Sequence, residues 1–131
     1  SNLKKVHQAS LDVLADGLKE LGLASGSRES IQNNELKLFY MHNTSHWLGM
    51  DVHDVGQYDH KGVPISFEKG MAFTIEPGLY FNPAFSGLNT KFDGIGVRIE
   101  DDIIIQSDCP EVLSFQIPKE IQEIEDFMAE S

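Results

Sequence analysis

Residues 40–58 read YMHNTSHWLGMDVHDVGQY and bring three histidines, His42, His46 and His53, into one short segment. Aromatic and β-branched residues alternate with polar ones here, and two glycines interrupt the segment, which predicts a turn, a strand and a second turn. The four-residue spacing of His42 and His46 therefore does not by itself indicate a zinc site on a helix face. A single histidine is more often a hydrogen-bonding group than a ligand, so the segment needs partners elsewhere in the chain.

The residues around this segment alternate between helical and strand patterns. Apolar residues recur at three- and four-residue steps before it, which predicts an amphipathic helix and then a shorter, weaker one. Period-two alternation dominates after it, which predicts strands separated by glycine- and proline-rich connections. The expected elements are helices over 3–21, 29–39 and 118–128, strands over 71–81 (broken at Pro77) and 95–106, a short strand over 112–115, and loops over 57–70 and 82–93. Together they predict an α+β fold, with helices on one side of a curved mixed or antiparallel sheet.

The length and charge of the chain limit what it can do. Its 131 residues suffice for one domain with a hydrophobic core. Its formal net charge of −11, without a basic cluster, speaks against nucleic-acid binding. The single cysteine, Cys109, cannot form an internal disulfide, and neither a membrane-spanning run nor a secretory signal is present, so we expect a cytoplasmic protein that does not enter a membrane. The opening Ser1-Asn2, with no methionine, suggests a piece of a longer chain.

Two acids outside the histidine segment are the most informative candidates. Glu76 (in TIEPGLY) and Glu100 (in GVRIEDD) both lie on stretches that we expect to be buried, where an unpaired carboxylate is costly. An ion pair with Arg98 is one explanation. The other is a divalent cation held by the two carboxylates and one imidazole, for which Mn²⁺, Co²⁺ or Zn²⁺ is suitable. Aspartates at 51, 54, 101 and 102 are weaker candidates, because turn formation or solvation explains them as well.

Three motifs in order, MHNTSHWLGMDVHDVG, GMAFTIEPGLYF and GIGVRIEDDIII, resemble the catalytic domain of Xaa-Pro aminopeptidases (aminopeptidase P), in the family that includes prolidase and methionine aminopeptidase. With the preceding helix and the PKEIQEIEDFM ending, the resemblance covers nearly the whole chain. It implies the α+β "pita-bread" fold and hydrolysis of an N-terminal residue from peptides whose second residue is proline.

The resemblance also implies a dinuclear metal centre. His46, Glu76 and Glu100 would be ligands, with Glu100 bridging two divalent ions, for which manganese is the first expectation and cobalt or zinc the alternatives. Ions about 3.5–4 Å apart activate water and polarise the peptide carbonyl, and Glu76 would pass a proton to the leaving nitrogen.

The same resemblance assigns roles around the metals. His42 and His53 would line the substrate pocket, and His53 would donate a hydrogen bond to the oxyanion. Arg98 and Tyr80 would hold the acids in place, with Arg98 also contacting substrate. Asn43 departs from the family, which has glycine there, but both residues tolerate positive φ. His7 and His60 are interpreted as ordinary structural or surface histidines.

Two aspartate ligands that the family places ten residues apart, upstream of the first helix, have no counterpart here. We therefore expect the C-terminal half of a pita-bread catalytic domain, without its first half and without the family's N-terminal domain. Alone it should be inactive, bind metal weakly or not at all, and self-associate through uncovered apolar surface. The alternatives are a prolidase, which cuts only dipeptides, a non-catalytic pita-bread binding module, and a mononuclear zinc hydrolase using His42, His46 and one acid.

Overall fold

A computed structural model describes residues 1–107 and 109–130. Helix α1 (Leu3–Glu20) begins where the Asn2 side chain accepts a hydrogen bond from the Lys5 backbone N–H, and the chain turns away at Gly22. The helix expected over 29–39 forms in two pieces, α2 (Arg28–Asn33) and the 3₁₀ helix η1 (Glu35–Leu38). The chain leaves helical geometry at Asn34, because asparagine competes for backbone hydrogen bonds.

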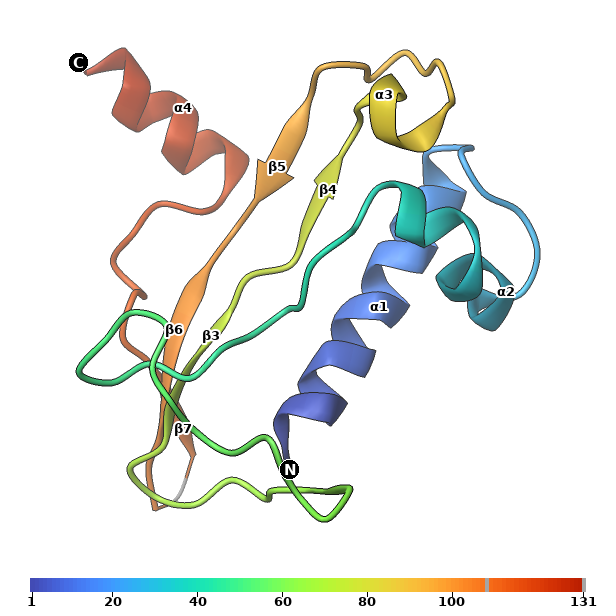
Figure 1. Cartoon of the computed structure of the whole chain (residues 1–131). Coiled ribbons are helices and arrows are strands. Elements are labelled where there is room, and N and C mark those ends of the chain that lie inside the picture. The colour runs from blue at the N-terminus through green and yellow to red at the C-terminus, as the bar shows by residue number, and fades with distance from the viewer. Residues whose placement is uncertain (108, 131) are drawn as a thin grey trace.

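Helices α1, α2 and η1 enclose the first of two hydrophobic cores. Its fully or almost fully buried members come from all three helices and from the strand region: Ala15, Leu18, Ile31, Leu36, Phe39, Tyr40 and Phe81. These residues place the start of the histidine segment directly against α1, since Tyr40 belongs both to the segment and to this core (Figure 1).

The strands pair only in antiparallel fashion among the described residues. They form three short sheets. The first has the strand order β3 (Ala72–Ile75), β6 (Asp101–Ile105), β7 (Pro110–Val112). The second pairs β4 (Gly78–Tyr80) with β5 (Gly96–Arg98), and the third is the hairpin of β1 (Asp59–His60) and β2 (Val63–Pro64). The break expected at Pro77 is confirmed, because β3 ends before it and β4 begins after it. The prediction of a single strand over 95–106 is wrong, because this segment forms two strands, β5 and β6, with a gap at residues 99–100.

Both strand breaks have one cause. Ile75 pairs with Asp101 below the break and Gly78 pairs with Arg98 above it, so the register is the same on both sides. Pro77 has no backbone N–H and interrupts the hydrogen-bond ladder between the two strands. The opposite strand is therefore also interrupted, at residues 99–100. The register therefore places Glu76 opposite Glu100, in the one bend that both strands share.

Residues 44–48 run antiparallel to β3 on the side away from β6. Backbone bonds join Thr44 O to Glu76 N (2.8 Å), His46 O to Thr74 N (3.0 Å) and Leu48 N to Ala72 O (3.0 Å). The strand expected in the histidine segment is thus present as an extended stretch, assigned as a bridge only at Trp47. The second core, built on Trp47, Phe73 and Ile103, holds this stretch on the sheet.

The remaining differences from expectation are local. The 57–70 connection contains the β1–β2 hairpin, the 82–93 loop contains the short helix α3 (Pro83–Ser86), and the last strand begins two residues early. Helix α4 (Ile121–Ala129) begins three residues after Pro118, where Glu120 and Glu123 form a capping box. It lies across the β4–β5 pair from α1, so the helices do not all lie on one side of the strands (Figure 1). Within the described ranges, no helix has the length and apolar character that a bilayer crossing requires.

Candidate metal centre

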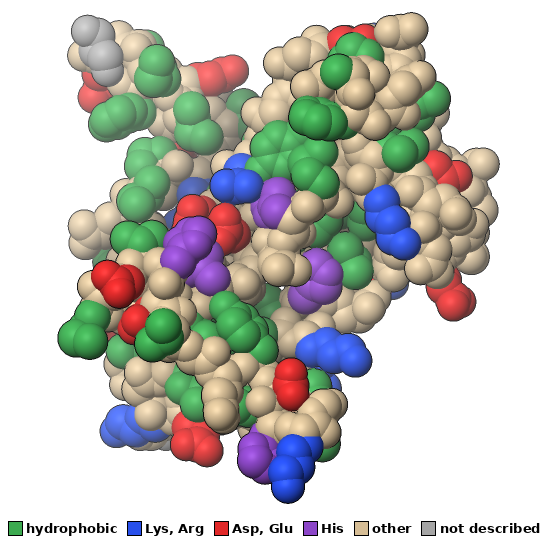
Figure 2. Space-filling view, in the orientation of Figure 1, with side chains coloured by type: hydrophobic (Ala, Val, Ile, Leu, Met, Phe, Trp, Pro, Cys, Tyr) green, Lys and Arg blue, Asp and Glu red, His purple; other side chains and the backbone are tan. Residues whose placement is uncertain are grey.

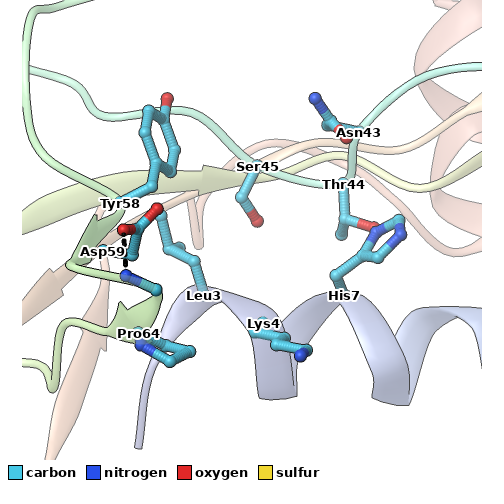
Figure 3. A pocket seen from close by; sticks show the side chains of 10 residues that line it. Leu3, Lys4, His7, Asn43, Thr44, Ser45, Tyr58, Asp59 and Pro64 are labelled. Carbon is cyan, nitrogen blue, oxygen red and sulfur yellow. Dashed lines mark hydrogen bonds between the residues drawn. The ribbon is translucent and has the colours of Figure 1, made fainter.

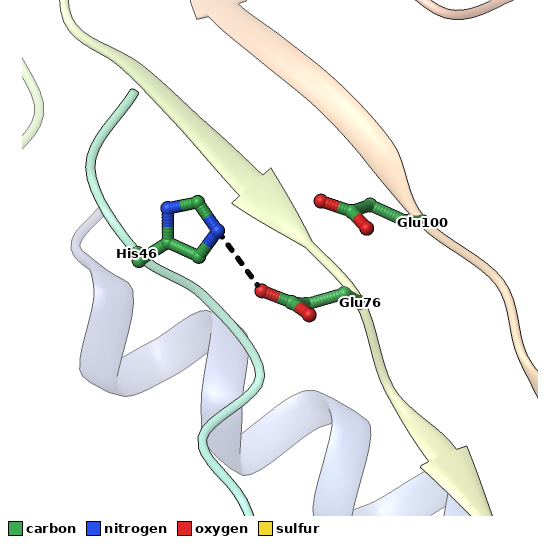
Figure 4. Close-up of side chains that lie close together, drawn as sticks. All are labelled: His46, Glu76 and Glu100. Atoms are coloured by element: carbon green, nitrogen blue, oxygen red, sulfur yellow. Dashed lines mark ion pairs between the residues drawn. The ribbon is translucent and has the colours of Figure 1, made fainter. Parts of the chain in front are cut away.

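The bend between the strands brings two carboxylates and one imidazole together. Glu76 follows β3, Glu100 lies between β5 and β6, and His46 reaches them from the extended 44–48 stretch (Figure 4). One ligand atom from each side chain lies within 4.8 Å of the others. Like charges directly opposite each other on paired strands are unfavourable, so this arrangement calls for a positive partner.

A hydrogen bond determines which nitrogen of His46 faces the acids. His46 Nδ1 lies 3.0 Å from the Trp47 carbonyl oxygen, which can only accept, so Nδ1 carries the hydrogen. His46 Nε2 then faces Glu76 Oε1, 3.3 Å away, where either a proton on Nε2 or a cation between the two atoms makes the contact favourable. Metal-binding histidines are usually oriented in this way, by a hydrogen bond from the ring nitrogen that does not bind the metal.

The geometry of the three ligands fits a divalent cation. Three atoms bonded to one ion at about 2.0–2.2 Å lie roughly 3–4 Å apart, so ligand atoms within 4.8 Å of one another can meet one ion after side-chain movements of about an ångström. Two carboxylate oxygens and one imidazole nitrogen are suitable for Mn²⁺, Co²⁺ or Zn²⁺. No other group of three potential ligands meets the same criterion in residues 1–107 and 109–130.

The two acids differ in burial, which corrects one expectation. Glu76 is only 9 % exposed, whereas Glu100 is exposed, and the expectation that both would be buried is wrong for Glu100. The reason is that β5 is exposed along its whole length and Glu100 follows directly after it. Glu76, by contrast, lies between β6 and the 44–48 stretch.

The ion-pair explanation holds only in part. Arg98 Nη1 lies 3.6 Å from Glu76 Oε2, but Arg98 is half-exposed, which weakens the pair. For Glu100, no ion pair is found in the part of the chain that the structure describes. Glu76 also accepts a hydrogen bond from Thr74 Oγ1 (3.1 Å), and that hydroxyl accepts from the His46 backbone N–H (3.1 Å). Arg98 therefore pairs with Glu76 but leaves Glu100 without a positive partner among the described residues.

His42 and Tyr80 form a second part of the site. His42 Nδ1 lies 2.8 Å from the Asn43 carbonyl oxygen and must donate, so Nε2 of the neutral ring accepts from the Tyr80 hydroxyl at 3.0 Å. The Arg98 guanidinium lies 5.7 Å from the centre of the Tyr80 ring. Arg98 thus contacts Glu76 on one side and Tyr80 on the other, and joins His42 to the metal ligands.

His53 lies beside His46. The centres of the two imidazole rings are 4.1 Å apart and His53 is exposed, so it is free to face a bound molecule. Histidine, acidic and cationic side chains gather in the middle of one face of the protein, beside hydrophobic ones (Figure 2). The structure therefore brings all seven residues singled out in the sequence into one region.

Other residues considered from the sequence have local roles. Asp54 accepts hydrogen bonds from the backbone N–H groups of Met50 and Val55, as a turn residue does. Asp101 binds Ser114 and Lys119; burial alone would raise the pKa of Asp101, but these partners hold it below its usual range. His42 is directed at Tyr80 and is not part of the ligand group, which speaks against a zinc site made of His42 and His46.

Sequence reasoning missed the threonines beneath the site. Thr74 and Thr44 are both 1 % exposed, and both are bonded to Glu76, one through its hydroxyl and one through its carbonyl. Thr74 could have been found from the sequence, because residues two apart on a strand, such as Thr74 and Glu76, lie on the same face. Thr44 also borders a cavity of about 360 Å³ between α1 and the β1–β2 hairpin, with His7, Ser45 and Leu3 (Figure 3).

An α+β domain in which paired strands and an extended stretch present an imidazole and two carboxylates to one point is of a class that can bind a metal ion. The sequence model described as metallopeptidase family M24 matches residues 1–107. The chain therefore belongs to metallopeptidase family M24.

Similar proteins agree with this family. The Xaa-Pro aminopeptidase of Haemophilus influenzae is 36 % identical over 129 residues, which are 98 % of this chain and 30 % of that protein. The Xaa-Pro aminopeptidase of Escherichia coli is 44 % identical over 117 residues, which are 88 % of this chain and 26 % of that protein. The solved structure of Pseudomonas aeruginosa aminopeptidase PepP is similar with a TM-score of 0.86 and 46 % identity over 95 % of this chain and 28 % of that one. The solved structure of proline aminopeptidase P II from Yersinia pestis is similar with a TM-score of 0.88 and 39 % identity. The match covers 100 % of this chain and 30 % of that one.

These comparisons confirm two expectations. The family resemblance and the α+β pita-bread fold are both correct. Membership of a metallopeptidase family implies divalent metal ions, in agreement with the ligand group. The chain spans only about 26–30 % of the length of these curated relatives.

Proposed function

We propose that this chain supplies the metal- and substrate-binding part of a Xaa-Pro aminopeptidase, which releases the N-terminal residue from peptides with proline in second position. The observation that carries the proposal is the register that sets Glu76 opposite Glu100, with His46 Nε2 3.3 Å from Glu76 Oε1. Relatives that carry this name match almost the whole chain.

In the proposed site His46, Glu76 and Glu100 would hold two divalent ions, for which Mn²⁺ is our first choice. When bound, such ions supply Lewis acidity and lower the pKa of water. Two aspartates from a segment that this chain does not contain would complete the set. Three ligands hold two ions poorly, so we expect the 131-residue chain to bind Mn²⁺ weakly.

The protein groups around the ligands have distinct proposed roles. Glu76, bonded through Oε1 to Thr74, would move a proton to the leaving nitrogen. His53, which is exposed and has its ring tilted against that of His46, would donate to the oxyanion that forms on the peptide carbonyl. His42 would bind substrate while Tyr80 fixes its ring, and Arg98 would hold Glu76 and contact the peptide.

The chain also has apolar surface that a partner would cover. Phe115, Ile117 and Ile121 are more than half exposed near the start of α4, and Val97 is exposed on β5. We propose that the first half of the catalytic domain covers this surface, and that the isolated chain self-associates through it. Light scattering at increasing concentration tests the second point, since a monomer at every concentration would contradict it. A cytoplasmic location also stays a prediction.

The function is tested with two preparations: the 131-residue chain and a protein that carries it at the full length of its relatives (the full-length protein). With Mn²⁺, we expect the full-length protein to release the first residue of a tripeptide Xaa-Pro-Xaa and the 131-residue chain to release none. Cleavage of an Xaa-Pro dipeptide alone would indicate a prolidase. A full-length protein that cleaves neither peptide but binds them would indicate a binding module.

A further inference from the structure

A buried hydroxyl beside the metal centre has two side-chain partners. Thr44 Oγ1 lies 2.8 Å from His7 Nδ1, which comes from helix α1, and 2.6 Å from the Tyr40 hydroxyl. Thr44 is 1 % exposed and Tyr40 is 5 % exposed, so water does not readily replace either contact. The three side chains form a polar cluster between α1 and the histidine segment.

The direction of these hydrogen bonds follows from counting hydrogens. Thr44 and Tyr40 each have one hydroxyl hydrogen. If Tyr40 donates to Thr44 and Thr44 donates to His7, every hydrogen at the two contacts is used. In the reverse order His7 donates to Thr44 and Thr44 to Tyr40, and the hydroxyl hydrogen of Tyr40 has no partner among its contacts in the structure. The first order is therefore favoured, and it requires a neutral His7 that accepts at Nδ1.

The charge environment agrees with this order. Burial and, secondly, the nearby His42 lower the pKa of the His7 imidazole below its usual value, which favours the neutral ring. Burial raises the pKa of Tyr40 and keeps its phenol protonated as a donor, although the Thr44 hydrogen bond acts in the opposite direction.

The cluster reaches the proposed active site by two routes. The Tyr40 ring packs edge-on against the His42 ring, with centres 4.7 Å apart, and the Tyr80 ring contacts the same imidazole. The backbone carbonyl of Thr44 accepts from the Glu76 N–H at 2.8 Å. Thr44 thus contacts both the residue that supports His42 and the backbone of a metal ligand.

We propose that Thr44 and His7 are positioning residues, which lock the Tyr40 ring and thereby set the orientation of His42 relative to Glu76. The side chain at position 7 then acts from helix α1, outside all three family motifs. Its effect on catalysis rests on the proposed function, whereas its effect on the His42 ring does not.

The test uses Thr44→Val, which keeps the shape of the side chain and removes the hydroxyl, and Thr44→Ser, which restores it. The ¹⁵N resonances of the His42 ring report the tautomer in the 131-residue chain. We expect well-separated resonances in the wild type and in Thr44→Ser, and resonances drawn together in Thr44→Val as the ring loses its single orientation. Ile31→Val is the matched control, because it removes one methylene from a fully buried side chain and leaves the Thr44 hydroxyl in place.

The inference is overturned if Thr44→Val leaves the His42 resonances as little changed as Ile31→Val does. If Thr44→Val does not fold, His7→Asn and His7→Leu replace it, since asparagine keeps an acceptor near Nδ1 and leucine does not. Only His7→Leu should then change the His42 resonances, and equal effects of the two would also overturn the inference.

In the full-length protein we expect Thr44→Val to lower kcat about 10–100-fold, with a smaller change in KM, and Thr44→Ser to restore it. A wild-type full-length protein without activity would count against the proposed function and leave the resonance test unaffected. Normal kcat in Thr44→Val would overturn the positioning role even if the function is correct.

Discussion

Two regions meet at the candidate metal centre, and they differ in how completely they are packed. The closed region consists of α1, α2, the 44–48 stretch and β3, and it contains Glu76 among buried residues such as Leu18 and Phe73. The open region consists of β5, residues 113–117 and α4, and it contains Glu100 beside exposed apolar side chains. The difference shows that one wall of the candidate site is closely packed, whereas the other is exposed.

The largest expected contrast is in stability. Leu18 is fully buried in the closed region, so Leu18→Ala should lower the free energy of unfolding by about 2–5 kcal/mol. Ile121 is 77 % exposed, so Ile121→Ala should change it by no more than about 0.5 kcal/mol. Urea unfolding at low protein concentration measures both. Equal losses would mean that the two regions are packed alike.

Metal affinity tests whether the two acids act together. In the full-length protein, Glu76→Gln and Glu100→Gln should each weaken Mn²⁺ binding at least about 10–100-fold, because each replaces a proposed ligand. Isothermal titration calorimetry gives the dissociation constants, and Glu111→Gln, at an acid outside the ligand group, is the control. If Glu100→Gln binds like the wild type, the open wall does not contribute a ligand.

Stability without metal should distinguish the same two acids. Glu100 has no ion-pair partner among the described residues, so Glu100→Gln should stabilise the chain by up to about 1 kcal/mol through removal of the repulsion across the bend. Glu76 has Thr74 and Arg98 as donors, so Glu76→Gln should give no such gain. Thermal unfolding in a chelator provides the comparison. A larger gain for Glu76→Gln would reverse the assignment of the two walls.

The smallest expected effect is the response of the closed region to acid. The pKa of His7 is lowered in the folded chain, so the unfolded chain takes up the proton more readily as the pH falls below about 6.5. The stability that neutral His7 contributes is thus present above this pH and is lost below it. Urea unfolding at several pH values should show a shallower loss in His7→Asn. An identical pH dependence would remove His7 as the cause.

Much of this structure was predictable from local patterns. The three- and four-residue spacing of apolar residues predicted α1, and proline predicted the break after Glu76, because both depend on short-range chemistry. The ligand group was also predicted by residue type and motif, although its roles remain proposals. The split of the 95–106 strand was not, because its cause, Pro77, lies on the opposite strand.

The sequence by itself determined the family, the α+β pattern and the identities of the residues at the site, because motif order and periodicity are properties of the chain alone. Only the tertiary structure decided that Glu76 and Glu100 stand opposite each other, that one is buried and the other exposed, and that His7 of α1 contacts Thr44 beneath them. These features arise from register and packing between segments far apart in the chain. Residue type alone does not specify such long-range pairings.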